Sequence, residues 1–162
     1  MVKSVQNMRA LNINAIEEQL NQIIFEYIDT SESWQKASTE LSEIERELEQ
    51  FFIKYIDENN GSLPKGNAYW YLFMDVVSKL LYFKGVANAK LNKDNEKEMS
   101  KVIEAWKASL LILPNNQIEN NREFLEEIIK SIQALSNETV NVEETTIEKN
   151  LQTYNQYLET KY

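Results

Sequence analysis

The two charges that interrupt the most apolar stretch of the chain are Asp75 and Lys79, in the segment YWYLFMDVVSKLLYF at residues 69–83. An acid followed by a base at the i,i+4 spacing forms an ion pair along one side of a helix. Tyr82 and Val86 continue this spacing by steps of three and four, so we expect all four side chains on one helical face. These four are the candidate binding residues. The alternative is that Asp75 and Lys79 form only a helix-stabilising ion pair.

Most catalytic chemistry is excluded because the chain contains no histidine and no cysteine. Catalytic triads, imidazole bases, thiolate zinc sites and disulfides all need one of these residues. The remaining route is a cluster of carboxylates that holds Mg²⁺ inside a helical bundle. The available acid pairs lie among surface-like charges: Glu17 and Glu18, Glu43 and Glu47, Glu126 and Glu127. The sequence therefore predicts a protein that is not an enzyme and has no metal and no cofactor.

An excess of acidic residues gives the chain a formal net charge of −9. Such a chain repels phosphate backbones, so direct binding to nucleic acid is not expected, whereas a basic protein partner is favoured. Excess glutamate is also typical of solvated helix faces. The segment 69–83 is too short to cross a bilayer, and the first residues contain no apolar segment of signal-peptide length. We therefore expect a soluble, cytoplasmic protein that does not bind membranes.

The scarcity of turn-forming residues, 3 glycines and 2 prolines, favours few and long elements and predicts an all-α fold. We expect about six helices in a single domain, 1–162, arranged as antiparallel hairpins in a bundle or a short repeat-like array. A long hairpin should span 14–58, and repeat-like helices should span 67–160. Helix-capping residues are expected at Asn14, Thr30 or Ser31, Asn67, Asn120 and Asn141.

A heptad seam follows the second expected helix, which should reach Glu58: Trp34, Ala37, Leu41, Ile44, Leu48, Phe51 and Tyr55. The seam predicts left-handed packing against a neighbouring helix. That neighbour is either the first helix of the same chain or a second copy of the protein, which would make a homodimer. Charged residues outside the seam are expected to face solvent: Glu40, Glu43, Arg46, Glu47 and Glu49.

Residues 80–116 resemble one tetratricopeptide repeat. The resemblance depends on Leu81 and Gly85 in the first helix of the unit, on Ile103 to Trp106 with Leu110 in the second, and on the closing Pro114-Asn115-Asn116. It implies a helical hairpin in which Gly85 lets the two helices approach closely and Trp106 fills the space between them. An array of such units needs about three of them to bury a continuous core.

The resemblance implies a non-catalytic protein–protein interaction module, or adaptor, that binds a peptide or extended segment in a groove lined by the first helix of each hairpin. Asp75, Lys79, Tyr82 and Val86 would face that groove, with the two charges as polar anchors on an apolar floor. The alternative is an irregular acidic bundle that serves as a subunit, inhibitor or immunity-type protein. It would bind a basic partner through the glutamate-rich faces of the second and fifth helices.

Overall fold

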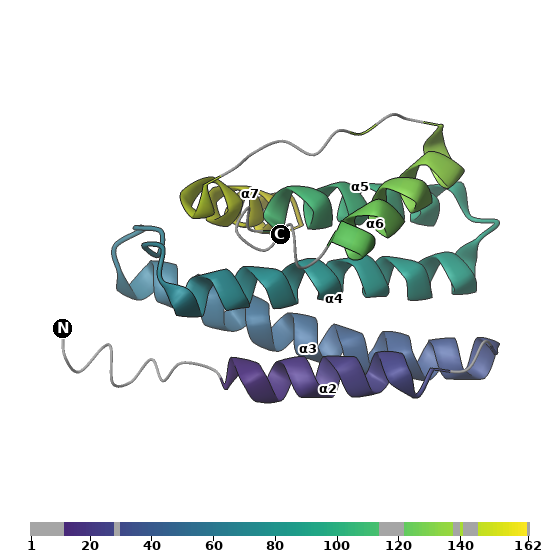
Figure 1. Ribbon diagram of the computed structural model, residues 1–162, viewed down its shortest axis with the longest axis horizontal. Coiled ribbons are helices and arrows are strands. Elements are labelled where there is room, and N and C mark those ends of the chain that lie inside the picture. The colour runs from purple at the N-terminus through teal and green to yellow at the C-terminus, as the bar shows by residue number, and fades with distance from the viewer. Residues whose placement is uncertain (1–11, 28–29, 114–121, 138–139, 141–145, 162) are drawn as a thin grey trace.

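The computed structural model describes residues 12–27, 30–113, 122–137, 140 and 146–161. These residues form six helices and no strand, which confirms the all-α prediction. The helices are α2 (Ile13–Phe25), α3 (Ser31–Glu58), α4 (Ala68–Asn92), α5 (Glu96–Ile112), α6 (Arg122–Ser136) and α7 (Ile147–Lys161). The antiparallel pair of α2 and α3 lies on one side of α4, and α5, α6 and α7 lie on the other (Figure 1).

Side-chain caps begin most of these helices. Thr30 accepts a hydrogen bond from the Ser33 amide at 3.1 Å, and Asn67 accepts one from the Trp70 amide at 3.2 Å, so both predicted caps are confirmed. The prediction for the first helix is wrong by two residues, because Asn12 rather than Asn14 accepts from the Ala15 amide. An asparagine two positions earlier offers the same side-chain oxygen to the first turn. The predicted caps Asn120 and Asn141 lie outside the described residues.

The core gathers around α4, which is apolar on most of its circumference. One group of core residues joins α4 to α2, α3 and α7, and in it the ring centroids of Phe52 and Tyr154 lie 4.9 Å apart. On the side of α5 and α6, Tyr82 packs against Trp106, with ring centroids 5.7 Å apart. A helix with neighbours on several sides needs this kind of all-round apolar surface.

The heptad seam of α3 is used within the chain, since its members from Trp34 to Leu48 are all buried. The intramolecular neighbours α2 and α4 therefore account for the pattern without a second copy. One expectation for the flanking positions is wrong. Glu49 was expected to face solvent, yet it is only 2% exposed, and its neighbour Glu45 is only 5% exposed. The reason is that α3 buries a second face, which turns toward α4 and α7.

The hairpin of α4 and α5 is tightly packed, as the repeat resemblance implies. A Cβ atom added at Gly85 would lie 2.8 Å from Cδ1 of Trp106, so only glycine leaves room for the indole. The Trp106 ring donates a hydrogen bond to the Tyr82 carbonyl at 2.9 Å. Ser78 and Ser109 each donate a hydroxyl to the other's carbonyl, both at 2.7 Å. These contacts confirm the predicted role of Gly85 and Trp106 at the helix–helix contact.

Within the described part of the chain, no helix combines the length and the apolar character that a membrane crossing requires. The proposed division into a hairpin, 14–58, and repeat-like helices, 67–160, stays a prediction.

Candidate functional site

A cleft of about 660 Å³ opens between four helices, α3, α4, α5 and α7. We call it the polar cleft. Its inner wall is apolar and buried, with Leu81 and Gly85 from α4 and Val102 from α5. Polar and charged side chains complete it: Ser38, Glu45, Lys84, Asn88, Glu98, Ser100, Lys101, Glu104, Tyr157, Thr160 and Lys161. A cavity of this size with converging polar groups has the properties of a ligand site.

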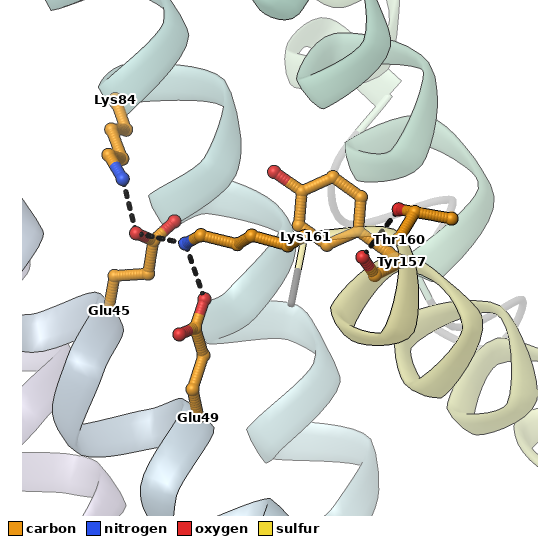
Figure 2. Close-up of polar contacts among 6 residues, drawn as sticks. All are labelled: Glu45, Glu49, Lys84, Tyr157, Thr160 and Lys161. Atoms are coloured by element: carbon orange, nitrogen blue, oxygen red, sulfur yellow. Dashed lines mark hydrogen bonds and ion pairs between the residues drawn. The ribbon is translucent and has the colours of Figure 1, made fainter.

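An ion cluster of two buried carboxylates and two partly exposed lysines contributes to the lining of the cleft (Figure 2). The Nζ atom of Lys161, at the end of α7, lies 2.7 Å from Oε1 of Glu45 and 2.7 Å from Oε1 of Glu49. Lys84 from α4 forms a third ion pair, also with Oε1 of Glu45. Two buried carboxylates are thus neutralised by two lysines that come from different helices, which is what burial of charge requires.

The electrostatics of the cluster keep Lys161 charged. Burial by itself lowers the pKa of Lys161, but the hydrogen bonds to Glu45 and Glu49 outweigh it, so the pKa lies above its ordinary value. Tyr157, which also lines the cleft, has its pKa raised to about 12, first by burial and then by the negative charge of Glu45.

The two oxygens of Glu45 differ. Oε1 accepts from both lysines, whereas Oε2 is buried and has no hydrogen-bond partner among the described residues. A buried carboxylate oxygen without a donor is uncommon, because each such oxygen loses its hydration without compensation.

A second set of contacts in the cleft lining involves Glu98 of α5. Glu98 accepts from the amide of Asn88 at 3.1 Å and pairs with Lys101 at 3.3 Å. The hydrogen bond from Asn88 and then that from Lys101 lower the pKa of Glu98. These contacts connect the end of α4 to the start of α5, so the two helices that supply most of the cleft are fixed relative to each other.

A second, apolar pocket of about 310 Å³ lies on the opposite face of α4. Its lining comes from four helices and from the segment that follows α2: Ile23, Ile24, Tyr27, Trp34, Ala37, Leu41, Tyr82, Phe83, Val86, Lys90 and Glu127. Tyr82 is buried, and its hydroxyl lies 3.0 Å from the Ser131 hydroxyl. Burial raises the pKa of Tyr82 to about 12, although the hydrogen bond with Ser131 lowers it.

The structure brings the predicted site residues together in pairs. Tyr82 and Val86 line the apolar pocket. Asp75 and Lys79 lie nearer the start of α4, where Nζ of Lys79 is 3.1 Å from Oδ2 of Asp75, and neither residue lines a cavity described above. The side chain of Asp75 is 8% exposed and that of Lys79 is 25% exposed, so the pair is mostly buried.

The acid pairs considered for a metal do not form a cluster. Among the residues that the structure describes, no group of three or more acidic side chains is placed to hold a metal ion. Glu18, Glu43, Glu47, Glu126 and Glu127 are all exposed.

The ion cluster was not predicted, although the sequence contains a signal for it. Lys161 continues the apolar seam of α7, after Ile147, Leu151, Tyr154 and Leu158, at the same spacing of three and four. Glu45 and Glu49 likewise precede Phe52 and Ile56 on one stripe of α3. A charge in register with apolar residues predicts a charge that is buried and therefore needs a partner.

Comparison with known proteins gave no match: no family model, no curated protein and no solved structure is significantly similar to this chain. The resemblance of residues 80–116 to a tetratricopeptide repeat therefore depends on the residues quoted for it.

Proposed function

We propose that this chain is a non-catalytic protein-interaction module that holds a segment of a partner protein in the polar cleft. The observation that carries the proposal is the cleft itself, with a volume of about 660 Å³, a buried apolar wall and ordered charges around it. Binding sites of this kind gain affinity from the apolar wall and specificity from a few placed polar groups.

The charges of the cleft suit binding better than catalysis. A general acid or base works best when its pKa lies near the operating pH. In the cleft the pKa values lie further from neutral pH than the ordinary values. Those of Lys161 and Tyr157 are raised, and that of Glu98 is lowered. Each of these groups therefore holds one protonation state around neutral pH, which supports a role in positioning a ligand.

The stripe of Asp75, Lys79, Tyr82 and Val86 offers the competing location for the same function. Because the apolar pocket and the polar cleft lie on opposite faces of α4, substitutions can separate the two locations. A peptide that docks on the stripe would contact Val86 in the apolar pocket and would not reach the residues of the polar cleft.

Selection from a displayed library of random peptides tests the proposal. Ala105→Trp fills the polar cleft from α5, and Ala134→Trp places the same ring on an exposed position of α6 outside both cavities. We expect peptides selected on the wild type to lose binding to the Ala105 variant and to keep it with the Ala134 variant. Circular dichroism checks that both variants are folded.

Two results of this selection would overturn the proposal. In the first, selected peptides bind the Ala105→Trp variant as they bind the wild type and fail to bind Val86→Trp or Asp75→Ala/Lys79→Ala. That result would assign the peptide site to the stripe of Asp75, Lys79, Tyr82 and Val86 instead of the polar cleft. If no selected peptide binds the Ala105→Trp and Ala134→Trp variants differently, the polar cleft is not a peptide-binding site.

A second candidate function is supported by the exposed acids of α6, Glu123, Glu126 and Glu127, together with the net charge of −9. In that case the protein is an acidic subunit or inhibitor that binds a basic protein surface. Its affinity would fall steeply with salt, because exposed charges are screened within about 10 Å at 0.1 M salt. Charge reversal of these three glutamates would weaken it, whereas Ala105→Trp would not.

A further inference from the structure

We propose that Asn60 is a site of covalent modification, at which deamidation proceeds only while the turn that ends α3 is open. The inference goes beyond the protein-interaction function and does not depend on it. It concerns the one Asn-Gly dipeptide of the chain, Asn60-Gly61, which lies in the segment that joins α3 to α4.

The two residues supply the reaction between them, with water as the only co-reactant. The amide nitrogen of Gly61 loses its proton and attacks Cγ of Asn60, so that a new N–C bond closes a succinimide ring and ammonia leaves. Water then opens the ring at either carbonyl, which gives aspartate or isoaspartate. Both residues are exposed to solvent, and glycine carries no side chain that would hinder the attack.

The closed turn opposes this reaction, because it engages the attacking amide. The Gly61 amide donates a hydrogen bond to the Ile56 carbonyl at 2.9 Å, and the Asn60 amide donates one to the Asp57 carbonyl at 3.4 Å. This pair of bonds is the Schellman motif that ends many helices. The Gly61 amide must leave Ile56 before it can lose its proton and approach the Asn60 side chain.

Opening of the turn nevertheless costs little free energy. Asn60 has a φ of 56°, in the left-handed region that asparagine tolerates better than most residues but that glycine adopts most readily. Hydrogen bonds at an exposed helix end open far more often than the core of a protein unfolds. The folded protein should therefore deamidate at Asn60, but more slowly than a flexible chain of the same sequence.

The modification changes the end of α3. Each event adds a carboxylate to a chain whose net charge is already −9. The new charge follows Asp57 and Glu58 at the C-terminal end of the helix, where negative charge is unfavourable. Isoaspartate also lengthens the backbone within the turn, so the bond from Gly61 to Ile56 loses its geometry. The modified turn is therefore less stable than the original one.

Mass spectrometry of the tryptic fragment 55–65 tests the inference, after incubation of the folded protein at neutral pH. Trypsin releases this fragment by cleavage after Lys54 and Lys65. A synthetic peptide of the same sequence lacks the rest of α3 and gives the rate for an open turn. We expect aspartate and isoaspartate at position 60 in both, formed about tenfold more slowly in the protein, which corresponds to about 1.4 kcal/mol of turn stability.

Asn59→Ala and Asn92→Ala are a matched pair of variants. The Asn59 side chain donates to the Tyr55 carbonyl at 2.7 Å in the last turn of α3, and the Asn92 side chain donates to Oδ1 of Asn88 at 2.6 Å at the end of α4. We expect Asn59→Ala to accelerate the reaction about threefold relative to a peptide with the same substitution, and Asn92→Ala to leave the rate unchanged. Circular dichroism checks that both variants are folded. Asn60→Gly keeps the turn and should abolish the product, which separates Asn60 from Asn59 in the same fragment.

Three results would overturn the inference. Equal rates in the folded protein and the peptide would show that the turn does not control the reaction. A fully converted peptide beside an unchanged protein would show that Asn60 is not modified in the native state. Equal acceleration by Asn59→Ala and Asn92→Ala would assign the effect to the stability of the whole protein instead of this turn.

Discussion

Replacing Gly85 with alanine should destabilise the protein, even though alanine is the better helix former. Gly85 lies in the interior of α4, where alanine is favoured over glycine by about 1 kcal/mol. The added methyl group, however, meets the Trp106 indole, with Cδ1 at 2.8 Å and Cε2 at 3.2 Å. Ordinary contacts between carbon atoms lie at about 3.5–4.0 Å, so the ring or the helix must move.

The size of the effect follows from what that movement breaks. Overpacking a well-packed core costs about 1–3 kcal/mol. The indole is held by its hydrogen bond to the Tyr82 carbonyl, 2.9 Å long and buried, and loss of this bond adds about 1 kcal/mol. After the gain in helix propensity, the expected net loss in the free energy of unfolding is about 1–3 kcal/mol.

Urea denaturation followed by far-ultraviolet circular dichroism measures this difference. The decisive control is the same substitution in a Trp106→Leu background, because the three nearest atoms to the added Cβ all belong to the indole. There, Gly85→Ala should be neutral, or stabilising by up to about 1 kcal/mol. A Gly85→Ala protein as stable as the wild type, or an equal loss in both backgrounds, would refute the assignment of Gly85 to this close contact.

Three further predictions concern other contacts. Lys161→Met removes the lysine from the buried Glu49 and should lower the free energy of unfolding by about 1–3 kcal/mol; urea denaturation measures it, and a variant as stable as the wild type would contradict it. Asn150→Ala removes the amide that donates to the Leu111 carbonyl at 2.9 Å at the end of α5; an expected loss of about 1–2 kcal/mol is measured by thermal unfolding, and an unchanged midpoint would show that the bond contributes nothing. Burial raises the pKa of Tyr82 to about 12, so the native state keeps this proton longer than the unfolded chain and stability falls as the pH rises from 10 toward 12; Tyr82→Phe should flatten that fall in a denaturation series, and an unchanged slope would argue against it.

Local patterns predicted the helices well because their causes are local. Thr30 and Asn67 begin α3 and α4 as expected, since a capping side chain reaches only to the amide of the first turn. The close contact of Gly85 with Trp106 was also predicted, from a resemblance that covers both helices of one hairpin. The cap of the first helix was placed at Asn14 instead of Asn12, because both asparagines lie close to the start of the same apolar pattern.

The candidate site was predicted only in part, because cavities depend on where distant helices meet. Tyr82 and Val86 do line a pocket, but the polar cleft lies on the other face of α4. Its lining comes from four helices, and no spacing within one helix encodes their relative placement. The charge pair that local spacing did identify, Asp75 with Lys79, is an ion pair within a single helix.

For the ion pair between Lys161 and Glu45, local spacing indicates that each charge lies on an apolar stripe but does not identify its partner. Lys161 and Glu45 are 116 residues apart in the chain, and their contact exists only because α7 packs beside α3 and α4. The apolar seam of α7 brings the helix to the core without choosing a single register, since a seam repeats along the helix. The two buried carboxylates of α3 favour the register that places Lys161 beside them, because a slip of α7 would leave these buried charges with one lysine fewer. The ion cluster that joins α7 to α3 and α4 also lines the polar cleft, so the same contact contributes both to the fold and to the lining of the cleft.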